Sequence, residues 1–389
     1  MDEYYDLVII GGGPAGLAAG IYGGRARLKT LILEKGSVGG RVFTTREIVN
    51  YPSVEDSTGP DLMEKMAQHA KDFGAEIRQQ GVRSVDFTGK DKIVKTRKIT
   101  YHAKAVIIAT GTSARVLGIP GEEEFAGAGV SYCATCDAEF YKDEDVVVLG
   151  SGDQAIEESE FIAKFAKSVT IIVMHDTGIL DCNAQSAEQA MKNPKLHFRY
   201  NSTIAEVYGD DEVKGVKLKN MCSGELTDFP CQGVFFFCGM IPETKFLAGA
   251  VPMDSRGWLI TDDDMDLGVG GVFAAGDVRE KYLRQVATAV GDGAAAATAA
   301  ERYITEMEQF RTNVLESDEP VELGFWDSTL DGSAEALDVI RGKERCCERA
   351  IRFIDMDVTR KKGIAAMYNI VLNEDNPAQS VIVEGKQDE

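Results

Sequence analysis

A glycine pattern near the N-terminus constrains the fold of this chain more than any other feature. The apolar run Leu7–Ile10 is followed at once by Gly11, Gly13 and Gly16, in the spacing G-x-G-x-x-G, and a small-residue helix is expected from Leu17. In such a strand–turn–helix, one glycine permits the tight turn, one lets the backbone approach a pyrophosphate, and one lets helix and strand pack closely. The pattern predicts a Rossmann-type fold that holds a diphosphate at the helix N-terminus.

An acidic residue strengthens this prediction. A second apolar run, from Lys29 to Leu33, ends at Glu34. That is about 20 residues past the turn, where an acid accepts hydrogen bonds from a ribose. A glycine-rich turn without a ligand is disfavoured, because the strands, the turn and the acid occur together.

The same pattern occurs a second time. Val146–Leu149 is expected as a strand, and Gly150, Gly152 and Ala155 follow it in the spacing G-x-G-x-x-A. A helix over 155–166 and a strand over 169–174 complete the unit. Two dinucleotide-binding folds in one chain suggest two dinucleotides. The simplest reaction that uses both is hydride transfer from a nicotinamide to a flavin.

Between the two patterns lies the string Cys133-Ala134-Thr135-Cys136-Asp137. A C-x-x-C beside a Rossmann pattern is typical of a redox pair, in which one thiolate attacks a disulfide and the other resolves it. No metal site is expected, since there is no second C-x-x-C and the four histidines lack ligand spacing. Asp137 is a candidate proton shuttle and also a candidate helix cap, and the two roles are compatible.

Composition excludes other classes of protein. The 389 residues favour two or three domains, and 42 Lys and Arg against 63 Asp and Glu give a formal charge of −21. Such a chain is a poor match for nucleic acid or an anionic membrane, and no apolar run is long enough to span a bilayer. The acidic start and eight scattered cysteines lead us to expect a cytoplasmic protein rather than a secreted disulfide framework.

Taken in order, these motifs resemble the low-molecular-weight thioredoxin reductases over residue 5 to about residue 310. Besides the two glycine turns and the cysteine string, the resemblance rests on Gly39-Gly40, Asn50-Tyr51-Pro52, Ala109-Thr110-Gly111, Gly276-Asp277 and Arg284-Gln285. It implies an α/β fold with two Rossmann-like domains, FAD in the first and a pyridine nucleotide in the second. It also implies a homodimer, a rotation between the domains, and a disulfide that passes electrons from flavin to thioredoxin.

The resemblance also implies site residues and domain boundaries. Cys133 and Cys136 are the redox pair, with Cys136 toward the flavin and Cys133 attacking the partner, and Asp137 is the proton donor. The FAD-binding domain is expected over 1–113 and 244–312, and the nucleotide domain over 114–243. The implied FAD contacts are Gly11, Gly13, Pro14, Ala15, Gly16, Glu34, Gly40, Arg41, Asn50, Thr110, Gly111, Gly276, Asp277, Arg284, Gln285 and Val286, and the implied nucleotide contacts are Gly150, Gly152, Asp153 and Gln154.

The chain departs from the family where NADPH would be recognised. Members that use NADPH carry His-Arg-Arg and a later Arg, which bind the 2′-phosphate. Here the string is Val173-Met174-His175-Asp176, and Ile179 stands in place of the later Arg. Asp176 and Asp181 would repel a 2′-phosphate, so NADPH is disfavoured and NADH is preferred. Two alternatives stay open: electrons enter from ferredoxin or another carrier, or the chain is a non-catalytic flavoprotein binding module.

Two smaller departures concern single residues. Arg41 replaces a Gln beside the flavin. It would either tune the redox potential of the flavin or make only a surface or phosphate contact. Ala138 replaces a Gly.

The C-terminal tail is expected to be a separate unit after a polar linker over 311–320. Strands are expected over 321–326, 350–354 and 380–383, and helices over 334–340 and 361–368. This order weakly resembles a thioredoxin fold, with Pro377 where that family has its cis-proline and Gly385 after the last strand. Leu330 and Ser333 stand where the exchanging cysteines would be, so residues 320–389 are interpreted as a degenerate thioredoxin-like domain. This domain would either dock where a partner protein docks or stabilise the dimer. Alternatively, it would be a decayed fusion that only adds solubility. Cys346 and Cys347 would be two free thiols.

Overall fold

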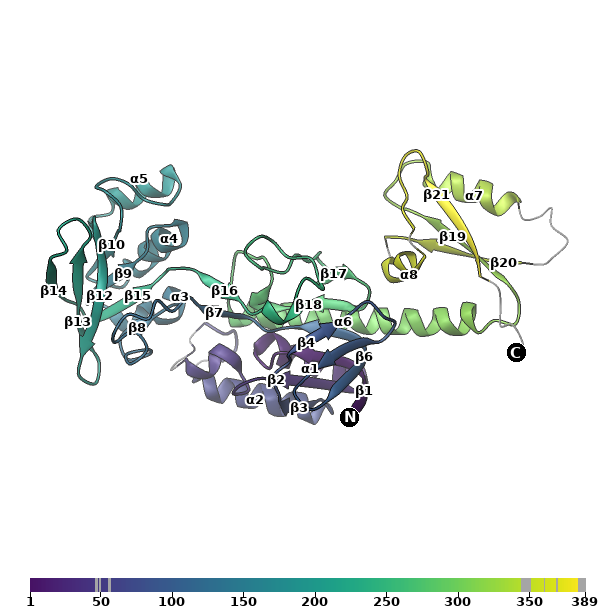
Figure 1. The fold of residues 1–389 in the computed structure, drawn as a ribbon, viewed down its shortest axis with the longest axis horizontal. Helices are drawn as coiled ribbons and strands as arrows, with labels where there is room; N and C mark the ends of the chain where they lie inside the picture. The colour runs from purple at the N-terminus through teal and green to yellow at the C-terminus, as the bar shows by residue number, and fades with distance from the viewer. Residues whose placement is uncertain are drawn as a thin grey trace. The chain divides into compact units, whose positions relative to one another are not determined.

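The computed structural model describes residues 1–45, 48, 50–54, 57–343, 351–359, 361–368 and 370–383. Contacts divide the chain into two compact units, which are described separately below. The first unit comprises Met1–Gly40, Met63–Gly111 and Pro242–Glu389, and the second comprises Arg41–Leu62 and Thr112–Ile241. The elements of both are labelled in Figure 1.

The first unit is built on a mainly parallel sheet with strand order β17-β18-β6-β1-β2-β3. The strand β1 pairs in parallel with β2 and β6, and Leu7, Val8 and Ile9 at its centre have no exposed surface. A strand that is apolar on both faces is typical of a covered parallel sheet. The strands are β1 (Asp2–Ile10), β2 (Thr30–Glu34), β3 (Glu76–Gln79), β4 (Ser84–Asp86), β5 (Lys92–Lys95), β6 (Thr100–Ile108), β17 (Asp266–Val269) and β18 (Val272–Ala274).

Two helices of this unit, α1 (Pro14–Arg25) and α6 (Val286–Phe310), pack closely against each other. A Cβ added to Gly293 of α6 would lie 2.1 Å from the carbonyl oxygen of Ala15 in α1, so the packing requires glycine there. The helix α6 begins with a capping box, in which the side chains of Gln285 and Thr288 bond each other's backbone. This pairing satisfies backbone N–H groups that the first turn of α6 would otherwise leave without partners. Short 3₁₀ helices of this unit cover Lys245–Leu247 (η3) and Gly276–Val278 (η4). The helix α2 (Gly59–Asp72) has most of its residues in this unit, whereas the 3₁₀ helix η1 (Gly40–Thr44) belongs mainly to the second.

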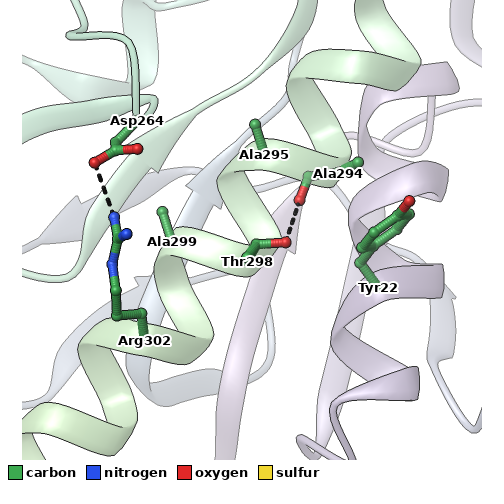
Figure 2. A pocket seen from close by; sticks show the side chains of 7 residues that line it. All are labelled: Tyr22, Asp264, Ala294, Ala295, Thr298, Ala299 and Arg302. Carbon is green, nitrogen blue, oxygen red and sulfur yellow. Dashed lines mark hydrogen bonds and ion pairs between the residues drawn. The ribbon is translucent and has the colours of Figure 1, made fainter.

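A shallow pocket of about 280 Å³ lies on the outer side of this helix pair (Figure 2). Tyr22 of α1 and a stripe of small residues on α6 form its walls, and an ion pair of 2.8 Å between Arg302 and Asp264 closes one end. None of the residues predicted to bind a cofactor lines it. We assign it no function.

The second unit has a parallel sheet with strand order β11-β10-β9-β15-β8. Alternate residues of β9 serve two cores: Val146 and Val148 pack beneath the helices, while Val147 and Leu149 pack against a three-stranded antiparallel sheet. This alternation is the period of two expected of a strand with both faces covered. The parallel strands are β8 (Val130–Ser131), β9 (Asp145–Leu149), β10 (Ser168–Ile172), β11 (Leu196–Arg199) and β15 (Gly233–Phe236), and the antiparallel sheet is β12 (Ser202–Gly209), β13 (Val213–Asn220) and β14 (Leu226–Pro230).

The helices of the second unit include α3 (Ala134–Asp137), α4 (Asp153–Ile162) and α5 (Ala184–Lys192), with a 3₁₀ helix, η2, over Ala138–Tyr141. Two further strands, β7 (Thr112–Ala114) and β16 (Met240–Pro242), pair with each other where the chain leaves this unit and returns. No helix in the described part of the chain is long and apolar enough to cross a membrane.

The tail forms a three-stranded sheet of order β20-β19-β21, in which β19 is parallel to β20 and antiparallel to β21. A helix covers each face of this sheet (Figure 1). Leu337 of α7 packs over Gly324 on one face, and Ile364 of α8 packs with Phe325 on the other. The elements are β19 (Val321–Trp326), α7 (Ser333–Lys343), β20 (Arg352–Asp357), α8 (Lys362–Met367) and β21 (Ala378–Val383).

Two expectations for the tail need correction. The linker expected over 311–320 is helical in its first half, because α6 runs to Phe310 and continues as a π-helical turn over Arg311–Leu315 (η5). Phe310 and Val314, four residues apart on one helix face, are 3% and 1% exposed in the core of the tail. The described residues contain no cis peptide bond, so Pro377 follows a trans bond. Cys346-Cys347 and Gly385 lie outside the described residues.

Candidate active site

The first glycine turn is held by two close backbone contacts. Gly11 has a φ of +112°, and a Cβ there would lie 2.3 Å from the carbonyl oxygen of Ala109. A Cβ on Gly16 would lie 1.8 Å from the carbonyl oxygen of Gly11. Gly13 differs, because the nearest atom to a Cβ there is the carbonyl oxygen of Gly39 at 3.9 Å. The turn therefore needs glycine at two positions for its own packing and leaves open space in front of the third.

Glu34 is the last residue of β2, as predicted, and its side chain is buried against the turn. Its Oε2 accepts a hydrogen bond of 2.7 Å from the backbone N–H of Gly12, and its Oε1 accepts one of 2.8 Å from that of Gly36. The carboxylate therefore braces the turn, and each oxygen keeps a lone pair for another donor.

Within the part of the chain that the structure describes, two buried polar atoms of predicted FAD contacts have no hydrogen-bond partner. They are Oγ1 of Thr110, which follows β6, and Nε of Arg284. The Arg284 guanidinium lies 3.9 Å from the centre of the Trp258 ring, and its burial lowers the pKa of Arg284. Buried polar groups normally find a partner, so these two atoms and the space at Gly13 are consistent with a dinucleotide bound at this turn.

Most of the predicted FAD contacts fall within the first unit. Gly40 lies close to Gly13, since a Cβ on Gly40 would be 3.5 Å from the Cα of Gly13, and Gly276 is packed against Ala15. Arg41 and Asn50 instead fall in the second unit. There Arg41 donates a hydrogen bond of 3.3 Å to Oγ1 of Thr112 and lies 3.9 Å from Sδ of Met240. The remaining predicted contacts of the first unit are Pro14, Ala15, Gly111, Asp277, Gln285 and Val286.

Cys133 and Cys136 are joined by a disulfide at the start of the short helix α3. The hydroxyl of Ser131 holds this segment together. It donates a hydrogen bond of 2.6 Å to Oδ2 of Asp137 and accepts one of 3.1 Å from the backbone N–H of Cys133. Ser131 was not predicted from the sequence, although its place at the end of β8, two residues before Cys133, is a signal that could have identified it.

Asp137 was also considered as a helix cap. It occupies the N-cap position of η2, but its side chain makes no capping hydrogen bond there. The side chain is turned instead to Ser131, beside the disulfide. The capping role is therefore wrong, and this position is consistent with the predicted proton donor.

The second glycine turn is built like the first. Gly150 has a φ of +137°, and a Cβ there would meet the carbonyl oxygen of Phe237 at 2.7 Å, whereas a Cβ on Gly152 would have no atom within 4 Å. Asp153 begins α4, and its Oδ1 accepts hydrogen bonds of 2.7 and 2.8 Å from the backbone and side-chain amide of Asn183. Gln154 is exposed on the same turn. In the described part of the chain, no group of three or more His, Cys, Asp or Glu could hold a metal ion.

Two dinucleotide-type turns and a C-x-x-C disulfide on one chain define a flavin-type disulfide oxidoreductase. Residues 5–293 match the family of pyridine nucleotide-disulphide oxidoreductases. The chain is 49% identical over 311 residues to a thioredoxin reductase of Peptoclostridium acidaminophilum, which covers 78% of this chain and 98% of that protein. It is 42% identical over 312 residues to a thioredoxin reductase of Bacillus subtilis, and this match covers 79% of this chain and 97% of that protein.

A solved structure gives the same result. The crystal structure of a thioredoxin reductase from Streptococcus pyogenes matches with a TM-score of 0.74 at 42% identity, covering 78% of this chain and 99% of that one. The chain therefore belongs to the thioredoxin reductase family and is an oxidoreductase that acts on disulfides. The matched relatives account for about four-fifths of the chain and leave the rest without a counterpart in them.

The open space at Gly13 leads to a prediction about cofactor binding. Gly13 has an extended backbone, with a φ of −78°, so an alanine fits without strain and its methyl group enters only the space in front of the turn. We expect Gly13→Ala to fold normally but to bind FAD at least about tenfold more weakly, as measured by flavin release on dilution. Gly16→Ala is the comparison, and it should lose the fold of the turn itself, seen as a large fall in melting temperature. Equal FAD affinity in Gly13→Ala and the parent chain would contradict the assignment.

Proposed function

We propose that this chain is an FAD-dependent thioredoxin-disulfide reductase in which the Cys133–Cys136 disulfide carries electrons to thioredoxin. The observation that carries the proposal is the disulfide itself, set beside an acid that Ser131 holds in position. When bound at the first glycine turn, FAD would supply the two electrons that open the disulfide. Family members are usually homodimers, and we extend that expectation to this chain.

The cysteines would act in a balanced sequence. Two electrons and a proton convert the disulfide to one thiol and one thiolate. The Cys133 thiolate attacks the disulfide of thioredoxin, forms a mixed disulfide with one partner sulfur and displaces the other as a thiolate. Cys136 then attacks Cys133, which reforms the internal disulfide and releases reduced thioredoxin once both of its sulfurs are protonated.

Asp137 would supply a proton to these sulfurs, which leads to the next prediction. We expect Asp137→Asn to bind FAD normally and to reduce thioredoxin about 10²- to 10³-fold more slowly, because an amide cannot act as a general acid. Turnover of thioredoxin measured across a pH series provides the test. Ser131→Ala, which frees the carboxylate and removes the acceptor of the Cys133 backbone N–H but keeps the acid, should lower the rate less and shift the pH profile. Unchanged turnover in Asp137→Asn would remove Asp137 from the mechanism.

We propose NADH as the electron donor in preference to NADPH. The arginines that would bind a 2′-phosphate are absent from the loop after β10, where Asp176 and Asp181 stand. Anaerobic mixing with NADH, NADPH or reduced ferredoxin, followed by the flavin absorbance, tests this directly. Fast bleaching by NADH alone supports the proposal, and bleaching by ferredoxin alone would replace it with the carrier-dependent alternative.

We propose that the tail is a degenerate thioredoxin-like domain. The support is the order β20-β19-β21, with parallel and antiparallel pairings on either side of β19, which is the arrangement a thioredoxin-type core needs. Ser333, in place of a cysteine, is buried and donates a hydrogen bond to the carbonyl oxygen of Pro377. A serine used in this way cannot exchange disulfides, so a docking or stabilising role is preferred.

A further inference from the structure

The loop after β10 returns to the second glycine turn. Residue Asp181 bridges to Gly152, and its backbone N–H donates a hydrogen bond of 2.9 Å to the carbonyl oxygen of Ser151. The Asp181 carboxylate is anchored from two sides: its Oδ2 accepts a hydrogen bond of 2.7 Å from the hydroxyl of Ser151 and lies 2.9 Å from Nε2 of His175. Ser151 belongs to the glycine turn, and His175 follows the end of β10. The carboxylate is therefore fixed between these two elements.

This is the position in which a Rossmann fold needs an acid. The nucleotide ribose lies between the glycine turn and the end of the second strand, where a carboxylate accepts its hydroxyl hydrogen bonds. In this chain β10 ends at Ile172 and is followed by the apolar residues Val173 and Met174. The usual position therefore holds no acid. Asp181 instead bonds to Ser151, which stands in the second glycine turn where Gly12 stands in the first, and Gly12 is the residue that Glu34 contacts.

The site around Asp181 is open to a ligand. The Asp181 side chain is 57% exposed, and its Oδ1 accepts no hydrogen bond within the described residues. The space in front of Gly152 is free, since an added Cβ would have no atom within 4 Å. A ribose could therefore reach both the Oδ1 acceptor of Asp181 and the free space in front of Gly152.

Charge then decides which ribose is accepted. The hydrogen bond from Ser151 lowers the pKa of Asp181, so the carboxylate carries its negative charge at neutral pH. A 2′-phosphate in the same place would face this charge without an arginine to offset it, since no Arg occurs between Met174 and Asn193. An unmodified 2′-hydroxyl would instead donate a hydrogen bond to the carboxylate.

We infer that Asp181 is the ribose-recognising residue of the second glycine turn and that it selects a dinucleotide without a 2′-phosphate. The inference rests on the proposed function, because it assumes a pyridine nucleotide as the donor. It assigns the selectivity to one carboxylate that the returning loop supplies, rather than to the strand end where the family places its basic residues.

The test measures binding and does not depend on turnover. Calorimetry on the full-length, FAD-loaded chain with ADP-ribose and with 2′-phospho-ADP-ribose gives both affinities. We expect the parent chain to bind ADP-ribose at least about tenfold more tightly, and Asp181→Ala to lose about tenfold to a hundredfold of that affinity, the range for a hydrogen bond to a charged group. Asp181→Asn, which keeps the shape and removes the charge, should bind the phosphorylated probe better than the parent does.

Asp176→Ala is the matched variant, since Asp176 is the other acid of the loop. Loss of ADP-ribose affinity in Asp176→Ala but not in Asp181→Ala would overturn the assignment, as would tighter binding of the phosphorylated probe, or of neither probe, by the parent chain. Each variant must keep the flavin spectrum and melting temperature of the parent, which shows that it has folded.

Dithionite separates this inference from the proposed function. With dithionite as the reductant and no nucleotide present, the parent chain should still reduce thioredoxin. Failure of the parent itself under these conditions would count against the proposed function, whereas failure of ADP-ribose binding alone counts only against Asp181.

Discussion

Replacing Cys136 by serine is expected to abolish thioredoxin reduction while the chain keeps its FAD. The Cys133–Cys136 disulfide is the only disulfide within the described residues, and a serine cannot take the place of a sulfur in it. A residual rate at least about 10³-fold below that of the parent is expected, since the step loses its covalent route. Thioredoxin turnover and the flavin spectrum of the purified variant are the two measurements.

The matched control for this substitution is Cys222→Ser. Cys222 is an exposed free cysteine in the same unit. We expect this variant to turn over at the parent rate, which excludes a general effect of losing a thiol. Full turnover by Cys136→Ser would refute the redox role of the pair.

Removing residues 318–389 is expected to make the chain aggregate. Phe310 and Val314 at the end of α6 would lose their cover, which comes from Val321 and Phe325 of β19 and from Ile364 of α8. Burial of such a side chain is worth about 1.5–3 kcal/mol, so the truncated chain loses stability and gains an exposed apolar patch. Light scattering and the melting temperature of the truncated chain are the measurements.

A second truncated chain, with Phe310→Ser and Val314→Ser, tests whether the exposed apolar patch causes the aggregation. If the patch is responsible, these substitutions restore solubility to the truncated chain, while in the full-length chain they lower the melting temperature. A truncated chain that is soluble without them would show that the tail packs less firmly than its contacts indicate. Unchanged thioredoxin kinetics and oligomeric state in the rescued truncation would reject a docking or regulatory role for the tail.

The two glycine turns could be predicted from the sequence because their signal is local. Gly16 is required by its contact with Gly11 in the same turn, and Glu34 ends its strand as its position in the apolar run indicates. Gly11 and Gly150 are required by contacts with Ala109 and Phe237, which are distant in the sequence, but the glycine spacing itself is a local pattern. Motifs of this kind carry their own structural context, so the residues and the fold are predicted together.

The features that were missed depend on contacts between distant residues. Asp181 meets Ser151 across 30 positions, and the sequence gives no indication that the loop turns back to the glycine turn. Phe310 and Val314 stand in or beside the polar, acidic stretch that was expected to be a linker, and their burial depends on β19 and α8 further along the chain. The contacts of Arg41 with Thr112 and Met240 likewise connect segments that sequence alone does not bring together, while its place beside the flavin stays a prediction.

An anaerobic titration with dithionite measures whether FAD and the Cys133–Cys136 disulfide accept electrons together. If FAD and the Cys133–Cys136 disulfide form one redox system, the parent chain should take up about four electrons before the flavin absorbance is fully bleached, and Cys136→Ser about two. Uptake of only about two electrons by the parent chain, with Cys133 and Cys136 still oxidised, would contradict the account.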